Sequence, residues 1–333
     1  MAGINSQNQL GYATLETIFG QAVPPTASAF KVTQLNTVPS QETIQRPDKN
    51  SSLSQTLGIG GVKSGTWSAR MALPGSAGAG TAPDIGPILQ AAFGKAPVVV
   101  PSTSVTYQLD DFSPSLSIWS YWKPADATQY VAIGSVVAQM SLDVGATGGT
   151  LEFSGPALWA LDTDQFANAD AIAKGGLASF PPEPASPVTT GNMITTFAGS
   201  VVIDGDNFAE VRTFRLTAAL NREIPTDVIF AGQYGASPSQ NRRDITFDMN
   251  IYDKAGDVDF SGLKDKAIRK VPMPVVITIG NAPGHTVVLD FGEVLIGIPN
   301  VDDGAVRKAI TFNGSRAHAS SGTAKDELTM AWK

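Results

Sequence analysis

The alternation of apolar and polar side chains constrains the fold of this chain more than any other feature. In residues 244–253 Ile, Phe, Met and Ile alternate with Asp, Thr, Asp and Asn. Residues 136–144 repeat the pattern, with an apolar face opposite Gln139, Ser141 and Asp143. Because successive side chains of a strand point to opposite faces, both segments predict strands with one buried and one wet face. The chain is therefore expected to be mainly β.

Helical signals are few. Helices are predicted over Ile85–Phe93 and Phe260–Lys270, and a further short one within Asp164–Lys174. The first follows a Gly-rich loop, and either Asp84 or Thr81 is expected to cap it, since Asp and Thr are favoured at N-caps.

The order of the predicted elements occurs twice. A strand, a helix and three further strands read as 66–73, 85–93, 116–122, 136–144 and 150–157, and again as 245–252, 260–270, 275–279, 293–304 and 310–317. The proline-rich stretch between them suits neither a helix nor a sheet interior. We therefore expect two tandem β-sandwich domains, each with one flanking helix, at 1–165 and 196–333, joined by a Pro-rich linker at 166–195. The alternative is a single large sandwich in which regular strands resemble one another by chance.

Composition excludes several kinds of site. The chain has 333 residues, no cysteine and two histidines, so disulfides and thiolate metal sites are excluded. The net charge of −7 makes it a poor candidate for binding DNA through release of counterions. We expect no metal and no cofactor.

No motif predicts catalysis. The Gly75–Gly80 loop lacks the Gly-Lys-Ser/Thr of a P-loop. Asp204–Asp206 and Asp302–Gly304 suit turns better than cation sites. The carboxylate pairs Asp110–Asp111 and Asp162–Asp164 cannot be told from solvated loop charges by spacing. We expect no catalytic residue.

One aromatic cluster could form a sugar-binding platform. Trp119, Tyr121 and Trp122 lie close together in a predicted strand. On an alternating strand such residues more often pack in a core or between subunits.

Three parts of the chain resemble one family. Leu15–Gln34, the loop-helix sequence of Thr81–Leu89 and the closing strands of each half are similar to the tail tube (major tail) proteins of long-tailed bacteriophages. The resemblance implies a β-sandwich or half-barrel unit with a flanking helix. It implies rings whose inner sheets join into a continuous β-barrel, stacked into a hollow conduit for the viral genome. A duplicated chain would form trimeric rings with pseudo-sixfold symmetry, where a single-domain chain forms hexamers.

The resemblance and the strand pattern together suggest residues for the lumen. Five polar side chains on predicted wet strand faces are candidates: Asp244, Asp248, Gln139, Ser141 and Asp143. Their negative or neutral character would repel phosphate and ease DNA transit.

The resemblance also implies a long loop that reaches the next ring. The candidate segments are Thr43–Gly65 and Ile224–Arg243. Their charged residues are Arg46, Asp48, Lys49, Asp227, Arg242 and Arg243.

The implied partners are further copies of the chain, the tail tip or baseplate, and the tape-measure and tail terminator proteins. DNA would pass without specific binding. The implied location is the virion tail, assembled in the host cytoplasm, and no membrane span is expected because no long apolar run is present.

Three other functions stay open at this stage. The chain could be a phage minor tail or host-recognition module, which would use the aromatic strand. It could be an enzyme that hydrolyses glycans with a carboxylate pair, or the tube protein of a related contractile secretion apparatus.

Overall fold

The computed structural model describes residues 7–46, 56–124, 127–169, 173–185, 187–189, 191–208, 210–227, 237–252, 260–302, 304 and 307–333. The chain is mainly β, with 52% strand and 7% helix, which confirms the predicted class. The two alternating segments form β8 (Gln139–Gly145) and β16 (Asp244–Tyr252), and their apolar residues are the buried ones.

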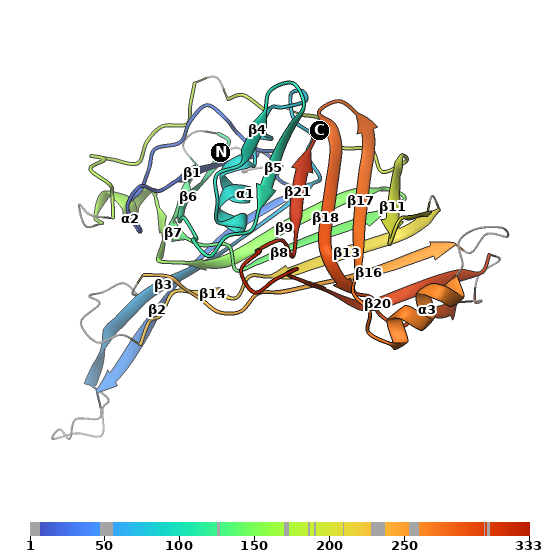
Figure 1. Ribbon diagram of the computed structural model, residues 1–333. Helices are drawn as coiled ribbons and strands as arrows, with labels where there is room; N and C mark the ends of the chain where they lie inside the picture. The colour runs from blue at the N-terminus through green and yellow to red at the C-terminus, as the bar shows by residue number, and fades with distance from the viewer. Residues whose placement is uncertain are drawn as a thin grey trace.

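Two antiparallel sheets make up the first half (Figure 1). The outer sheet has the order β1-β6-β7-β10: β1 (Gln9–Leu15), β6 (Leu116–Trp122), β7 (Tyr130–Ser135) and β10 (Trp159–Asp162). The inner sheet has the order β2-β3-β9-β8: β2 (Gln34–Arg46), β3 (Thr56–Ala72), β9 (Gly148–Ala157) and β8. Ile118 from the outer sheet and Phe153 from the inner sheet are buried in one core.

The second half has a matching order of strands, but its outer and inner strands also pair with each other and so belong to one sheet. Its outer sheet has the order β11-β17-β18-β21: β11 (Gly199–Ile203), β17 (Met273–Ala282), β18 (His285–Leu295) and β21 (Thr329–Trp332), with β12 (Asp206–Phe208) on the other side of β11. Its inner strands pair in the order β13-β16-β20-β19: β13 (Val211–Ala219), β16, β20 (Ala309–His318) and β19 (Asn300–Asp302).

The same pairing order therefore occurs twice along the chain. β1, β6, β7 and β10 correspond in turn to β11, β17, β18 and β21. β2, β3, β9 and β8 correspond to β13, β16, β20 and β19. Phe153 and Phe312 occupy matching places, because each is buried and pairs with the preceding inner strand, at Ala69 and Met249 respectively.

The two halves are joined twice by strand pairing. β13 pairs with β8, so the two sets of inner strands form one continuous sheet. β21 pairs with β5 (Ser104–Gln108) of the first half, and β4 (Val98–Val100) pairs with β5 at the edge. One hydrophobic core contains residues of both halves. The two halves share a sheet and a hydrophobic core, so no break in either one marks a domain boundary. The boundaries at 165 and 196 stay a prediction.

The predicted linker packs against the first half. Its first two residues are the last two of the short helix α2 (Thr163–Ala167), whose N-cap Asp162 accepts a hydrogen bond from the Gln165 amide at 2.7 Å. Further on, the ring of Phe180 lies 5.1 Å from that of Trp119. The Val188 amide donates to the carbonyl of Ala27 at 2.7 Å. Through these contacts the described part of the linker packs against the first half.

The two longer helices occur where the sequence predicts them, as α1 (Gly86–Phe93) and α3 (Phe260–Ile268). The predicted cap of α1 is wrong. The N-cap residue is Ile85, and no side chain caps it; neither Asp84 nor Thr81 does so. Gly94 ends the helix at a φ of 86°, in the left-handed region that favours glycine.

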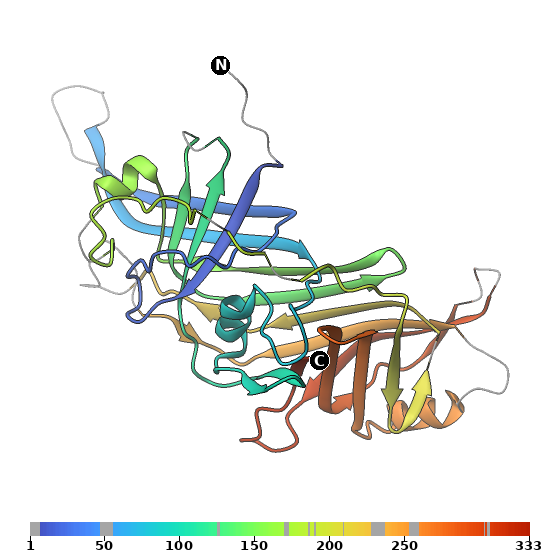
Figure 2. The same cartoon turned by 90° about the horizontal axis from the view of Figure 1, so that it is seen from above.

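β6 is buried on both faces, because the inner sheet covers one and the linker segment covers the other. Thr43–Gly65 was expected to be a loop. Its described residues continue β2 and β3 as a hairpin that projects beyond the two sheets, which we call the arm (Figure 2). The corresponding segment of the second half holds the short strands β14 (Arg222–Glu223) and β15 (Ser239–Gln240).

Replacing Trp332 tests whether the halves form one cooperative unit. The Trp332→Ala variant should lose about 3–5 kcal/mol of unfolding free energy, since the fully buried ring leaves a cavity between β5 and β18. Denaturant unfolding followed by tryptophan fluorescence and circular dichroism should show one transition. Phe197→Ala, at a side chain that is 88% exposed, is the control. Two separate transitions, only one of them shifted, would contradict a shared core.

Candidate assembly surface

One face of the continuous inner sheet is polar across both halves. On β8 the exposed or half-buried residues Gln139, Ser141 and Asp143 alternate with buried ones. On β16 Asp244 and Asp248 do the same. β13 lies between these strands and pairs with both, which brings all five predicted lumen candidates to one face.

The sequence did not predict the positive charges on this face. Arg215 of β13 lies opposite Asp143 on one side and Asp248 on the other. Arg70 of β3 lies opposite Glu152 of β9. The face therefore carries positive charge as well as the negative and neutral groups of the five candidates, with carboxylates and guanidinium groups on adjacent strands. The missed signal was the alternation in residues 213–219, where Phe214, Leu216 and Ala218 are buried.

Two of the predicted acids are engaged within the sheet. Asp244 accepts from Arg316 of β20, with Nε 3.0 Å from Oδ1. Asp248 accepts from the Gly314 amide at 2.7 Å. Both contacts are exposed to solvent, so they hold the carboxylates in place with little net stabilisation. The face is a hydrated surface of mixed charge with many hydroxyl and amide groups.

The inner sheet ends in two strands that pair on one side only among the described residues. β2 pairs with β3, and β19 pairs with β20. Val301 of β19 corresponds to Leu142 of β8. Val301 lies opposite Ile310 of β20, Leu142 lies opposite Leu151 of β9, and Ile310 and Leu151 are matching residues of the two halves. Leu142 is fully buried, whereas Val301 is 61% exposed. The two edges lie toward opposite ends of the molecule (Figures 1 and 2).

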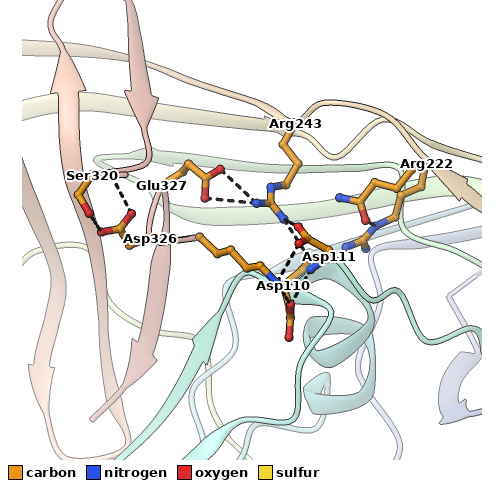
Figure 3. Close-up of polar contacts among 9 residues, drawn as sticks. Asp110, Asp111, Arg222, Arg243, Ser320, Asp326 and Glu327 are labelled. Atoms are coloured by element: carbon orange, nitrogen blue, oxygen red, sulfur yellow. Dashed lines mark hydrogen bonds and ion pairs between the residues drawn. The ribbon is translucent and has the colours of Figure 1, made fainter. Parts of the chain in front are cut away.

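A charged network holds the junction of the halves behind the polar face (Figure 3). The Arg243 side chain is only 10% exposed, and its Nη2 donates to Glu327 Oε1 at 3.1 Å. Its Nη1 donates to the Asp110 carbonyl at 2.9 Å and lies 3.5 Å from Asp111 Oδ1. Lys325 contacts both aspartates. The residues before β21 are thereby connected to those after β5.

The network shifts the pKa values of its members. The hydrogen bond from Lys325 holds the pKa of Asp110 below its ordinary value of 3.8, and the same contact raises the pKa of Lys325. Arg222 lies deeper, and burial lowers its pKa to about 10. It donates to the Ala91 carbonyl at 2.5 Å, at the end of α1.

The residues predicted for contacts between rings lie in different surroundings. Asp48 and Lys49 lie outside the described residues, and Arg46 ends β2. Asp227 and Arg242 are exposed. Arg243 pairs with Glu327 and Asp111 of its own chain.

Several of the residues considered for binding or catalysis make contacts within the chain. Trp119 is fully buried and Tyr121 is 3% exposed, so these two rings pack in the core, while Trp122 at the end of β6 is half-buried. Asp110 and Asp111 accept from the cations described above, and Asp162 caps α2. No group of three potential metal ligands occurs within the described part of the chain. No helix found there is long and apolar enough to cross a membrane.

No protein-family model matches the chain, and no curated protein matches it either.

Two arginines provide a matched test of the junction. Arg243→Ala should lower the free energy of unfolding by about 2 kcal/mol, since it leaves a poorly solvated Glu327 without its partner. Arg316→Ala, which removes an exposed pair with Asp244, should cost under about 1 kcal/mol. Equal losses in urea unfolding at neutral pH would contradict a special role for Arg243.

The junction should weaken in acid. Because the folded-state pKa of Asp110 is depressed, its contribution is present above the unfolded value near 3.8 and is lost as pH falls through the folded value. The wild-type protein should lose stability more steeply than Asp110→Asn when the melting temperature is followed from pH 5 to about pH 2. Asp206→Asn, in β12, is the control. Identical curves for wild type and Asp110→Asn would exclude this contribution.

Proposed function

We propose that the chain is a structural subunit that assembles side by side into rings, and that the rings stack into a hollow tube of the bacteriophage tail type. The observation that carries the proposal is the β8–β13 pairing. It joins two equivalent sets of inner strands edge to edge, and the same joint between copies would extend the sheet further.

The free edges of the inner sheet support closure into a ring. In the chain, Leu142 of β8 lies opposite Leu216 of β13. The matching residues at the two free edges are Val301 of β19 and Thr37 of β2. Contact between two different patches repeats head to tail, and it gives a ring when the rotation closes. Closure would also remove the exposed strand edges, which otherwise favour aggregation.

The polarity of the two faces of the inner sheet indicates which face would line the lumen of the tube. The apolar face of the inner sheet is covered by the outer sheets and by α1, so only the polar face is left for a lumen. Such a face would hold water and carry alternating charges, among them Asp143, Arg215 and Asp248. DNA would then pass without a continuous basic track to bind it, because Arg215 has a carboxylate on each side.

The repeat favours trimeric rings with pseudo-sixfold symmetry, since each chain would supply two units. The partners would be stacked rings, the tail tip or baseplate, and the tape-measure and terminator proteins. The site of action would be the virion tail, and the role would require no catalysis or cofactor. A tube of a related secretion apparatus would use the same surfaces. Burial of Trp119 and Tyr121 removes the platform that a host-recognition module would use.

Electron microscopy of the purified protein at rising concentration tests the function. Rings or hollow tubes with threefold or pseudo-sixfold end views are expected. Discrete oligomers that never form a ring, or a strict monomer even when a tail tip complex is supplied as initiator, would overturn the proposal.

A charge at the free edge should block assembly without unfolding the subunit. Val301→Lys places an ammonium group where the neighbouring β2 would pack, and the residue is exposed in the monomer. Rings should disappear while the melting temperature changes little. Val99→Lys, at an exposed site on β4, should assemble normally. Rings formed equally well by both variants would exclude β19 as the joint.

A further inference from the structure

The internal repeat contains a template for a second contact between copies. The β2–β3 hairpin of the first half corresponds to the β13–β16 hairpin of the second. Beyond the shared sheet, each hairpin continues into a segment of its own. These two segments have different surroundings in the chain, and the difference is informative.

The second-half segment lies on the first half. The amides of Leu220 and Asn221 donate to the Ala138 carbonyl at 2.8 and 3.2 Å. Arg222 reaches the Ala91 carbonyl at the end of α1 and is almost fully buried there. The segment thus covers two places: the last turn of α1 and the residues just before β8.

The arm of the first half projects away from the two sheets and exposes apolar side chains. Ile44 and Ile59 lie directly opposite one another across its two strands, and both are exposed. Leu57, nearer the described end of the arm, is 88% exposed. Large apolar side chains gathered on a projecting hairpin are typical of a surface that another protein covers.

The matching places on the second half carry exposed apolar side chains as well. They are the end of α3 and the residues around the start of β19. Ile268 and Val271 at the end of α3 are exposed, as are Ile298 and Val301. In the first half, Phe93 at the end of α1 is buried, whereas before β8 and β19 the two halves agree, since Val137 and its counterpart Ile296 are both buried. At the end of α3 the second half therefore lacks the cover that the first half has.

The arm cannot supply that cover within its own chain. It projects at one end of the molecule, and α3 lies at the other (Figures 1 and 2). A second copy placed by the β8–β13 relation would bring its arm to the uncovered surface, because the arm follows β2 as the covering segment follows β13.

We propose that the arm, residues 43–46 and 56–65, docks on the neighbouring copy of the same ring, over the end of α3 and the residues before β19. The inference rests on the proposed side-by-side assembly and adds its second contact. It assigns Ile44, Leu57 and Ile59 to one side of the contact, and Ile268, Val271 and Ile298 to the other. Burial of these groups would stabilise the ring beyond what strand pairing supplies.

Engineered cysteines test the contact, because the chain has none of its own. The double variant Ile44→Cys/Ile268→Cys would be treated with a flexible bis-maleimide under assembling conditions. Thr37→Cys/Val301→Cys reports the strand joint independently. Ile44→Cys/Val99→Cys is the control. Val99 is 50% exposed, close to the 55% of Ile268, but it lies on β4, away from the proposed contact. Covalent products would be separated in denaturant and counted by mass.

The expected result is a ladder of multimers for the arm pair that stops at the subunit number of one ring, and none for the control. A ladder that continues past that number would place the arm on the next ring and overturn the inference. So would equal linking by the control pair. Linking by Thr37→Cys/Val301→Cys without linking by the arm pair would refute the arm contact and leave the proposed function standing. No linking by either pair, with no rings in the microscope, would refute both.

Discussion

The pairing of β8 with β13 is the interaction on which the rest of the structure depends. It aligns six consecutive residues of each strand, from Phe214 opposite Val144 to Ala219 opposite Gln139. Through it, strands from both halves become one sheet, and the side chains beneath that sheet become one core. Strand pairing of this length satisfies backbone donors and acceptors that would otherwise face solvent at two edges. Among the described residues, β2 and β19 are the two edge strands of the inner sheet, because each pairs on one side only.

The polar face and the charged junction have different physical roles, although both contain arginine and carboxylate groups. Arg316 and Asp244 meet in solvent, where pairing contributes little. Arg243 is mostly buried and satisfies Glu327, Asp111 and a backbone carbonyl at once. The second arrangement fixes the position of the segment before β21 relative to β5. The first lies on the solvent-exposed face of the inner sheet.

The two halves of the chain have the same order of strands but different surroundings. Matching residues of the two halves can therefore be compared directly. Leu142 is buried and Val301 is exposed, and the segment after β13 is covered where the arm after β2 is not. In the proposed assembly, a further copy would cover the positions at which the two halves differ.

The sequence by itself determined the strand class, the inward and outward faces of β8 and β16, the two longer helices and the doubled order of elements. Each of these follows from local periodicity, because side-chain direction in a strand or helix is set by nearby backbone. Only the tertiary structure decided that β8 meets β13, that Arg215 stands between Asp143 and Asp248, and that Arg243 faces Glu327. These contacts join residues far apart in the chain, and parity shows which face a side chain takes but not which strand lies beside it. The cap of α1 and the two-sided burial of β6 escaped prediction for the same reason, since both depend on what packs around them.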